Sequence, residues 1–382
     1  MKQLFLLLLF STAVFSQKTT ELFPSNKLGG SREITIGLPP SYEKTPTKKY
    51  PILILLDGDY LFDPFYGAFN YGAYWDDLPE TIIIGISQNT NEERTDDCGY
   101  DEVSGIPSGK SADFFEFIGA ELLPYVEKKY RVAPFRIIAG HDLTAGFLNF
   151  FLYKDNPIFN AYISLSPELA PEMESKVPEK LAKLKQPVFY YQSSADGDVK
   201  DLLDPIQKLD SNVKLVPNPL LNYKYDHFKG ASHYSLVLFS IPSALNQFFD
   251  SYKPISLSEY TDKIAVLPNG YVKYLTDKYD GISKNLGLKV GIRVSDFKAI
   301  EAAILKNKAY PELEKLSQIA RKSYPKAMLS DYELGLMYEK LGDIKRAVKS
   351  YQTASQFEEI GDLTKDMMFE KFDDMKSLMP KK

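Results

Sequence analysis

The sequence has very few cysteines and histidines. Its 382 residues include one cysteine, Cys98, and three histidines, His141, His227 and His233. A single cysteine excludes an internal disulfide and any cysteine-based metal site. We therefore expect a fold that is held together by packing alone, with no metal ion and no cofactor.

The sequence also lacks a block of like charges and a second long apolar run. The formal charge is -5 and there is no basic stripe, so a nucleic-acid partner is not expected. The apolar run at residues 4–15 is shorter than the roughly 20 residues that span a bilayer, so no transmembrane segment is expected either.

The same apolar run has the features of an export signal. It follows a lysine, and Val14 and Ser16 are the small residues that a signal peptidase needs. We expect a signal peptide over residues 1–16, cleaved before Gln17, and an exported protein that is periplasmic or secreted. The alternative is a buried N-terminal strand.

Aromatic residues, by contrast, are abundant, and they fall in alternating strand-like and helix-like segments. The 26 tyrosines and 24 phenylalanines are enough for a large core. Expected strands, most of them continuously apolar, cover residues 32–38, 50–56, 81–87, 135–139, 161–165 and 187–192. Continuous apolar strands separated by helical patterns predict a mostly parallel sheet with helices on both faces. Residues 32–38 alternate and should be antiparallel.

After residue 254 the pattern changes to amphipathic helices with Lys and Glu on their outer faces. Residues 331–354 match the tetratricopeptide repeat pattern at Leu334, Gly335, Tyr338, Gly342, Ala347, Tyr351 and Ala354. A solenoid needs about three repeats to bury its faces, so a plain helical appendage is an equal alternative. We predict an α/β domain over residues 17–254 and a small all-α domain over residues 255–382.

One turn carries a catalytic pattern with an unusual residue. The strand at residues 135–139 runs into residues 140–146 (GHDLTAG), and a helical pattern follows. Strand, turn and helix are the context of the nucleophile elbow, G-x-S-x-G, in which the central side chain points into the site. Asp142 stands at the serine position, and Thr144 stands at the second glycine.

With this elbow the chain resembles the esterase D-like family of α/β hydrolases, which includes ferric-enterobactin-type esterases and S-formylglutathione hydrolases. The resemblance covers about residues 30–250 and rests on motifs in the correct order. These are LDG at 56–58, RTD at 94–96, FIGAELLP at 117–124, KYR at 129–131 and LSP at 165–167. The resemblance implies an α/β-hydrolase fold, a helical tail of the kind some bacterial members have, and ester hydrolysis as the family's activity.

The resemblance also implies the other site residues. His233 stands at the position of the family's catalytic histidine, and Asp196 fits the position of the acid, with Asp198 as the reserve. His227 lies in an apolar segment, and we expect it to be structural. The oxyanion hole would come from backbone N–H groups, namely those of Leu143 and of Asp59 or Tyr60.

An aspartate at the elbow changes the chemistry. A serine nucleophile works because a neutral histidine takes its proton, whereas Asp142 carries no proton at pH 7. His233 would lie between Asp142 and Asp196, and both carboxylates favour its charged form. We therefore predict lost or altered ester-hydrolase activity. The protein would bind an ester-like small molecule at this site, or a protein partner through its helical tail.

Four alternatives remain open. The protein could still be an active carboxylic-ester hydrolase that works by another route. Asp142 could attack an alkyl carbon, as the elbow aspartate of epoxide hydrolases and haloalkane dehalogenases does, although no cap domain is evident. Asp142 could also persist because aspartate tolerates a positive φ.

Asp57, Asp59 and Asp63 resemble a calcium loop but lack the glutamate that closes one. Residues 96–110 are expected to form a loop over the pocket.

Overall fold

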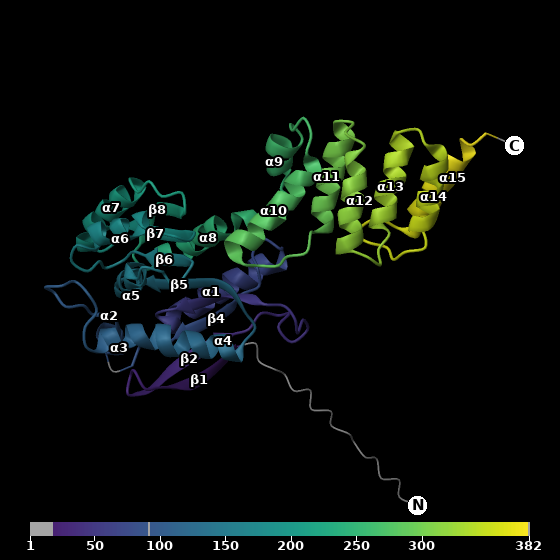
Figure 1. The fold of residues 1–382 in the computed structure, drawn as a ribbon. Helices are drawn as coiled ribbons and strands as arrows, with labels where there is room; N and C mark the ends of the chain where they lie inside the picture. The colour runs from purple at the N-terminus through teal and green to yellow at the C-terminus, as the bar shows by residue number, and fades with distance from the viewer. Residues whose placement is uncertain (1–17, 91, 381–382) are drawn as a thin grey trace, which may run out of the picture. The chain divides into compact units, whose positions relative to one another are not determined.

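The computed structural model describes residues 18–90 and 92–380 (Figure 1), so the predicted signal peptide lies outside the described residues. The chain divides into one unit of residues up to Ala73 plus Pro79–Phe248, and a second of Tyr74–Leu78 plus the residues from Phe249 onward. The division thus falls at 248/249, before the boundary expected at 254/255. Tyr74–Leu78 joins the helices because Asp76 accepts a hydrogen bond from Arg293 Nη2 at 3.1 Å. Among the described residues, no helix has the length and apolarity needed to cross a bilayer.

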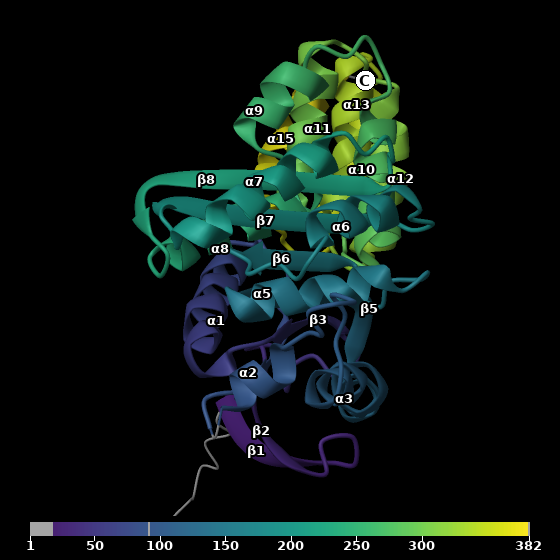
Figure 2. The same cartoon turned by 90° about the vertical axis from the view of Figure 1, so that its left-hand side faces the viewer.

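The first unit is built on one eight-stranded sheet in the order β1-β2-β4-β3-β5-β6-β7-β8 (Figure 2). Its strands are β1 (Lys18–Ser25), β2 (Gly30–Gly37), β3 (Tyr50–Leu55), β4 (Ile82–Ile86), β5 (Val132–His141), β6 (Ala161–Leu165), β7 (Val188–Gly197) and β8 (Leu221–Ser232). β2 pairs antiparallel with β1 and β4, and all other pairs are parallel. Every residue of β3, β4 and β6 is buried, as continuous apolar strands require.

The two edge strands, β1 and β8, were not predicted. β8 has the sequence LNYKYDHFKGAS, and only one of its residues is buried. An edge strand is partly exposed to solvent and therefore carries charged side chains without any continuous apolar run. This is why a search for apolar strands misses it, although it forms the longest pairing of β7.

Helices connect the parallel strands and pack on the sheet. They are α1 (Gly58–Tyr74), α2 (Glu93–Cys98), α3 (Lys110–Glu116), η1 (Phe117–Leu122), α4 (Leu123–Lys129), α5 (Leu143–Phe147), η2 (Leu148–Tyr153), α6 (Met173–Ala182), α7 (Lys200–Lys214) and α8 (Leu236–Phe249). Their apolar faces and the strands share one core, to which Phe114, Phe117, Phe147 and Tyr162 contribute buried rings. The expected α/β architecture is confirmed.

The second unit is entirely helical. Short turns η3 (Asp250–Tyr252), α9 (Leu257–Glu259) and η4 (Tyr260–Ile264) precede α10 (Tyr271–Leu286), α11 (Val294–Lys306), α12 (Glu312–Ser323), α13 (Leu329–Lys340), α14 (Ile344–Ala354) and α15 (Lys365–Ser377). From α10 to α15, helices that follow each other in the chain pack together (Figure 1). The predicted repeat falls on α13 and α14, where Gly335 lies so close to Tyr351 that a Cβ atom would be 2.5 Å from the ring. The helical character is confirmed; the tetratricopeptide identity stays a prediction.

Candidate active site

The bend between β5 and α5 places Asp142 at its tip. Asp142 has φ 60° and ψ −122°, a region that non-glycine residues rarely adopt. The helix crowds the turn, because a Cβ atom on Gly140 would lie 2.7 Å from Thr144 Oγ1 and one on Gly146 would lie 1.7 Å from the carbonyl oxygen of Glu168. The strand, turn and helix of the predicted elbow are therefore all present, and the strain is stored at the residue that replaces serine.

His233 lies directly after β8 and faces the elbow. Its Nδ1 is 2.6 Å from Asp198 Oδ1, and its Nε2 is 3.9 Å from Asp142 Oδ1. The imidazole is therefore placed between two carboxylates, as expected, but one of the two is not the predicted residue. The distance to Asp142 is too long for a hydrogen bond, so of the two carboxylates only Asp198 forms a hydrogen bond with His233.

The prediction that Asp196 is the acid beside His233 is wrong. Asp196 accepts hydrogen bonds from His227 Nε2 at 2.9 Å and from the N–H of Gly230 at 3.0 Å. The strand was expected to end at residue 192, but β7 continues to Gly197, and its pairing with β8 shifts register between Ala195 and Gly197. Asp196 therefore still lies in the strand, and Asp198 is the first residue beyond it. His227, expected to be structural, is the histidine that binds Asp196.

Ser166 of the LSP motif supports the pair of His233 and Asp198. Ser166 is fully buried with φ 44°, donates a hydrogen bond to Asp198 Oδ1, and lies 3.2 Å from His233 Nδ1. Burial alone would raise the pKa of Asp198, but the hydrogen bonds from His233 and Ser166 lower it below its usual range. Asp198 is thus an ionised carboxylate whose Oδ1 contacts His233 and Ser166, while its Oδ2 accepts the N–H of Ala195 at 3.0 Å.

Arg94 is the functional residue that the sequence analysis missed. Its Nη1 and Nη2 each lie 3.3 Å from Asp142 Oδ2, and its Nε donates to Asp57 Oδ1 at 2.7 Å. Burial would lower the pKa of Arg94, but the hydrogen bond and the charge of Asp57 raise it above its usual value. The RTD motif marked Arg94 in the sequence, but it did not predict the ion pair with Asp142, because the two residues are 48 positions apart in the chain.

Asp57 links Arg94 to the elbow through Thr144. Thr144 Oγ1 donates to Asp57 Oδ2 at 2.6 Å and accepts the N–H of His141 at 2.9 Å. Thr144 therefore does not distort the turn in which it replaces the family's glycine; its hydroxyl closes the turn. Asp57, buried and bound by both Arg94 and Thr144, fixes the position of the bend.

His141, next to Asp142, ties the elbow to the loop of His233. Its Nε2 donates to the carbonyl oxygen of His233 at 2.9 Å, and its Nδ1 lies 3.0 Å from the Tyr60 hydroxyl. Burial and the neighbouring His233 lower the pKa of His141. The Tyr60 hydroxyl donates its one proton to Asp57 Oδ2, so the bond from Nε2 to the His233 carbonyl is the one that makes His141 a positioning group for the His233 loop.

The backbone donors predicted for an oxyanion hole fall at two helix starts. Leu143 and Asp59 lie in the first turns of α5 and α1. The N–H of Tyr60 donates to the carbonyl oxygen of Asp57 at 3.2 Å, which leaves Leu143 and Asp59 as the candidates.

The aspartates of the supposed calcium loop do not share a common centre. Asp59 accepts hydrogen bonds from Ser87 and Gln88, while Asp63 pairs with Lys18 and Asp57 with Arg94. No group of His, Cys, Asp or Glu that could hold a metal ion occurs in residues 18–90 and 92–380.

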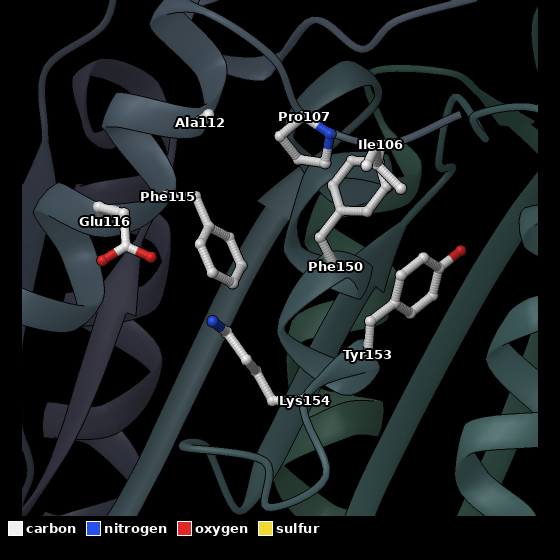
Figure 3. Close-up of a pocket in the computed structure, with 8 residues that line it drawn as sticks. All are labelled: Ile106, Pro107, Ala112, Phe115, Glu116, Phe150, Tyr153 and Lys154. Carbon is white, nitrogen blue, oxygen red and sulfur yellow. The ribbon is translucent and has the colours of Figure 1, made fainter. Parts of the chain in front are cut away.

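A cavity of about 250 Å³ lies under the loop that was expected to cover the pocket (Figure 3). It is lined by Ile106, Pro107, Ala112, Phe115, Glu116, Phe150, Tyr153 and Lys154. The Lys154 ammonium is 5.0 Å from the centre of the Phe115 ring. None of the lining residues belongs to the Asp142, His233 and Arg94 constellation, so the loop shapes a cavity of its own.

Comparison with known proteins agrees with this geometry. Residues 25–214 match the family described as "Putative esterase". An uncharacterised protein from Capnocytophaga ochracea is 30% identical, with a TM-score of 0.86 over 94% of this chain and 100% of that chain. No curated protein matches the chain.

Two more distant structures show the fold alone. An IroE-like serine hydrolase from Shewanella oneidensis is 19% identical, with a TM-score of 0.61 over 80% of this chain and 99% of that chain. A siderophore hydrolase from Aspergillus nidulans is 14% identical, with a TM-score of 0.52 over 61% of this chain and 95% of that chain. The family match over residues 25–214, the full-length relative and the elbow geometry together support an esterase-like α/β-hydrolase fold for the chain.

Proposed function

We propose that this site has lost the serine mechanism of its family and binds a ligand without hydrolysing an ester. The observation that carries the proposal is the elbow carboxylate, which faces Arg94 at 3.3 Å and forms no hydrogen bond with His233. In the serine mechanism the histidine takes the proton of the nucleophile. An ionised Asp142 has no proton to give, and its charge would repel the developing oxyanion of an acyl-transfer reaction.

The other parts of the esterase machinery support the view that the loss is confined to one residue. Asp198 forms a hydrogen bond with His233, and Ser166 donates one to Asp198. Leu143 is the first residue of α5, directly after the elbow residue. A serine at position 142 would place a hydroxyl where the family has its nucleophile. Restoring the hydroxyl should therefore restore hydrolysis.

The test compares the wild type with Asp142→Ser and Asp142→Ala on p-nitrophenyl acetate and butyrate. We expect the wild type and Asp142→Ala to show the same background rate, and Asp142→Ser to exceed it by about 100-fold or more. His233→Ala in the Asp142→Ser protein is the control and should remove the gain. A wild type that is faster than Asp142→Ala by orders of magnitude would overturn the proposal.

A second candidate is an aspartate nucleophile that attacks an alkyl carbon. It is favoured by the 3.9 Å between His233 Nε2 and Asp142 Oδ1, because an imidazole that does not bind the nucleophile is free to activate water. Against it, Arg94 engages the other oxygen of Asp142, and only α5, η2, β6 and α6 lie between the elbow and β7, which leaves no cap. If Asp142 were the nucleophile, turnover of an alkyl halide in H₂¹⁸O would place ¹⁸O in the Asp142 carboxylate. Mass spectrometry of the proteolytic peptide that contains Asp142 tests this, and an unlabelled peptide would exclude the aspartate mechanism.

Export and the role of the helical unit are part of the same proposal. We infer that the chain is processed before Gln17 and that the helices α10 to α15 contact a protein partner. The support is the apolar run at residues 4–15 and the repeat pattern on α13 and α14. Mass spectrometry of the protein from an expressing Gram-negative host should find Gln17 as the first residue, and an intact Met1 would contradict export by this signal.

A further inference from the structure

A pocket rich in lysine lies near the amino ends of β6 and β7. It has a volume of about 350 Å³ and is lined by Lys154, Asp155, Pro157, Lys180, Lys183, Leu184 and Lys185. Four lysines and one carboxylate therefore share this pocket, in a chain whose formal charge is -5. We call it the lysine pocket. A concave surface with an excess of positive charge attracts anions.

The lysine pocket is separate from the elbow. β5, β6 and β7 run parallel, so their carboxyl ends lie on one side of the sheet and their amino ends on the other. Asp142 directly follows the carboxyl end of β5, whereas residues 154–157 lie shortly before β6 and residues 183–185 shortly before β7. Gln186 Nε2 donates to the carbonyl oxygen of Pro157 at 2.9 Å and joins these two loops. A ligand of this pocket would not touch the elbow.

The four lysines of the pocket are not used by the fold. Among residues 18–90 and 92–380, none of them forms an ion pair, not even with the aspartate that lines the same pocket. Two carboxylates of α6 pair with other lysines, Glu172 with Lys176 and Glu174 with Lys208. Three carbonyl oxygens at the end of α6, which a lysine could cap, accept hydrogen bonds from Asn218 Nδ2 at 3.1 to 3.3 Å. The positive charge of the pocket is therefore available to an anion.

Lys154 connects the lysine pocket to the apolar cavity of Figure 3, which we call the aromatic cavity. This cavity of about 250 Å³ is also lined by the rings of Phe115, Phe150 and Tyr153. Lys154 Nζ lies 5.0 Å from the centre of the Phe115 ring, and Figure 3 shows it directed at that ring. Since an apolar cavity of about 150 Å³ can hold benzene, the aromatic cavity has room for a larger ring.

We propose that the lysine pocket and the aromatic cavity form one binding site for a small molecule that joins a phosphate group to an aromatic ring. The phosphate binds among the lysines, and the ring enters the aromatic cavity. A phosphate monoester carries about 1.5 to 2 negative charges at pH 7 and three acceptor oxygens, so it suits several lysines better than a carboxylate does. The proposal goes beyond the proposed function and does not rest on it, because no residue of the elbow takes part.

Isothermal titration calorimetry on the full chain at pH 7 tests the site with 1-naphthyl phosphate, 1-naphthol and inorganic phosphate. We expect 1-naphthyl phosphate to bind about tenfold more tightly than either of the other two, because it uses both cavities at once. Raising the salt concentration from about 0.05 M to about 0.5 M should weaken its binding several-fold. The proposal is overturned if 1-naphthol binds as tightly as 1-naphthyl phosphate, or if inorganic phosphate does.

A double lysine variant tests the phosphate half of the site. Lys183→Gln with Lys185→Gln removes two charges from exposed side chains and should weaken 1-naphthyl phosphate about tenfold, without changing the affinity for 1-naphthol. Lys44→Gln with Lys49→Gln is the matched control, because these lysines are also exposed and form no ion pair within residues 18–90 and 92–380. The control should change neither affinity. Equal losses in the two double variants, or no loss in the first, would contradict the assignment.

Ala112→Leu tests the aromatic half. Ala112 belongs to α3 and lines the aromatic cavity, and leucine is nearly as good a helix former, so the longer side chain fills part of the cavity and keeps the helix. The variant should lose most of the advantage of 1-naphthyl phosphate over inorganic phosphate, while the affinity for inorganic phosphate stays the same. Its melting temperature serves as the control for folding. An unchanged preference for 1-naphthyl phosphate would exclude the ring from this cavity.

Discussion

β7, β8 and the residues that directly follow them carry two histidine–aspartate pairs, and the pair of His233 and Asp198 is the one that faces the elbow. His227 and Asp196 lie 2.9 Å apart, and His233 and Asp198 lie 2.6 Å apart. Each histidine also has a serine hydroxyl near its Nδ1, at 2.9 Å in the first pair and 3.2 Å in the second. The chemical groups are the same, so the difference between the pairs comes from their surroundings.

Burial separates the two pairs. The side chains of His227 and Asp196 are 29% and 54% exposed, whereas those of His233 and Asp198 are 10% and 0% exposed. Water competes for the hydrogen bonds of the His227–Asp196 pair, so this pair contributes little to the free energy of unfolding. Its role is to link β7 to β8. Its serine, Ser194, is fully buried and also bound to Tyr225, which prevents a substrate from reaching the hydroxyl. A serine, a histidine and an aspartate in contact are therefore not sufficient for a hydrolase site.

The largest expected effect concerns activity in the Asp142→Ser protein. There, Asp198→Asn should remove the gain, lowering the restored ester hydrolysis by about 100-fold to the background rate, because the amide no longer stabilises the imidazolium or its tautomer. Asp196→Asn should stay within about threefold. Steady-state rates of p-nitrophenyl butyrate hydrolysis measure the loss caused by each variant. A larger loss with Asp196→Asn would mean that the two pairs have been assigned to the wrong roles.

The two serines beside the histidines should also differ in their effect on activity, but by less than the two aspartates. In the Asp142→Ser protein, Ser166→Ala should reduce kcat about tenfold, because Asp198 loses a charge-assisted hydrogen bond and holds His233 less well. Ser194→Ala should leave kcat unchanged. The comparison uses kcat at saturating ester, and equal losses in the two variants would contradict the difference in role.

Stability should depend on pH through the buried pair. The lowered pKa of Asp198 means that its stabilisation is complete above the unfolded-state pKa and is lost as the pH falls through the folded-state pKa. Asp198→Asn should therefore lower the free energy of unfolding by about 1–3 kcal/mol at pH 7, and by less at pH 3. Urea denaturation at both pH values measures this. The same loss at both would show that the charge of Asp198 is not what stabilises the fold.

The smallest effect is expected for the exposed pair. His227→Gln should change the free energy of unfolding by less than about 1 kcal/mol, because exposed ion pairs are weak. Raising the ionic strength should reduce the difference from the wild type further. Thermal denaturation in low and high salt tests this. A loss as large as that of Asp198→Asn would erase the distinction between the pairs.

The elbow was predictable because its signal is local. Glycines at 140 and 146 with an apolar strand before them specify a crowded strand–turn–helix, whatever the rest of the chain does. The acid was misplaced by two residues because the end of β7 is decided by its pairing with β8. That strand carries Lys224, Asp226 and His227, and a search for apolar periodicity does not detect it.

The sequence by itself determined the α/β class, the helical second unit, the elbow with Asp142 at its tip and the histidine opposite. Each depends on residues close together in the chain, where periodicity and turn chemistry act directly. Only the tertiary structure decided that Arg94 pairs with Asp142 and that Asp198 holds His233. The physical reason is that ion pairing and burial depend on distance in space, and the residues involved are separated by tens of positions along the chain.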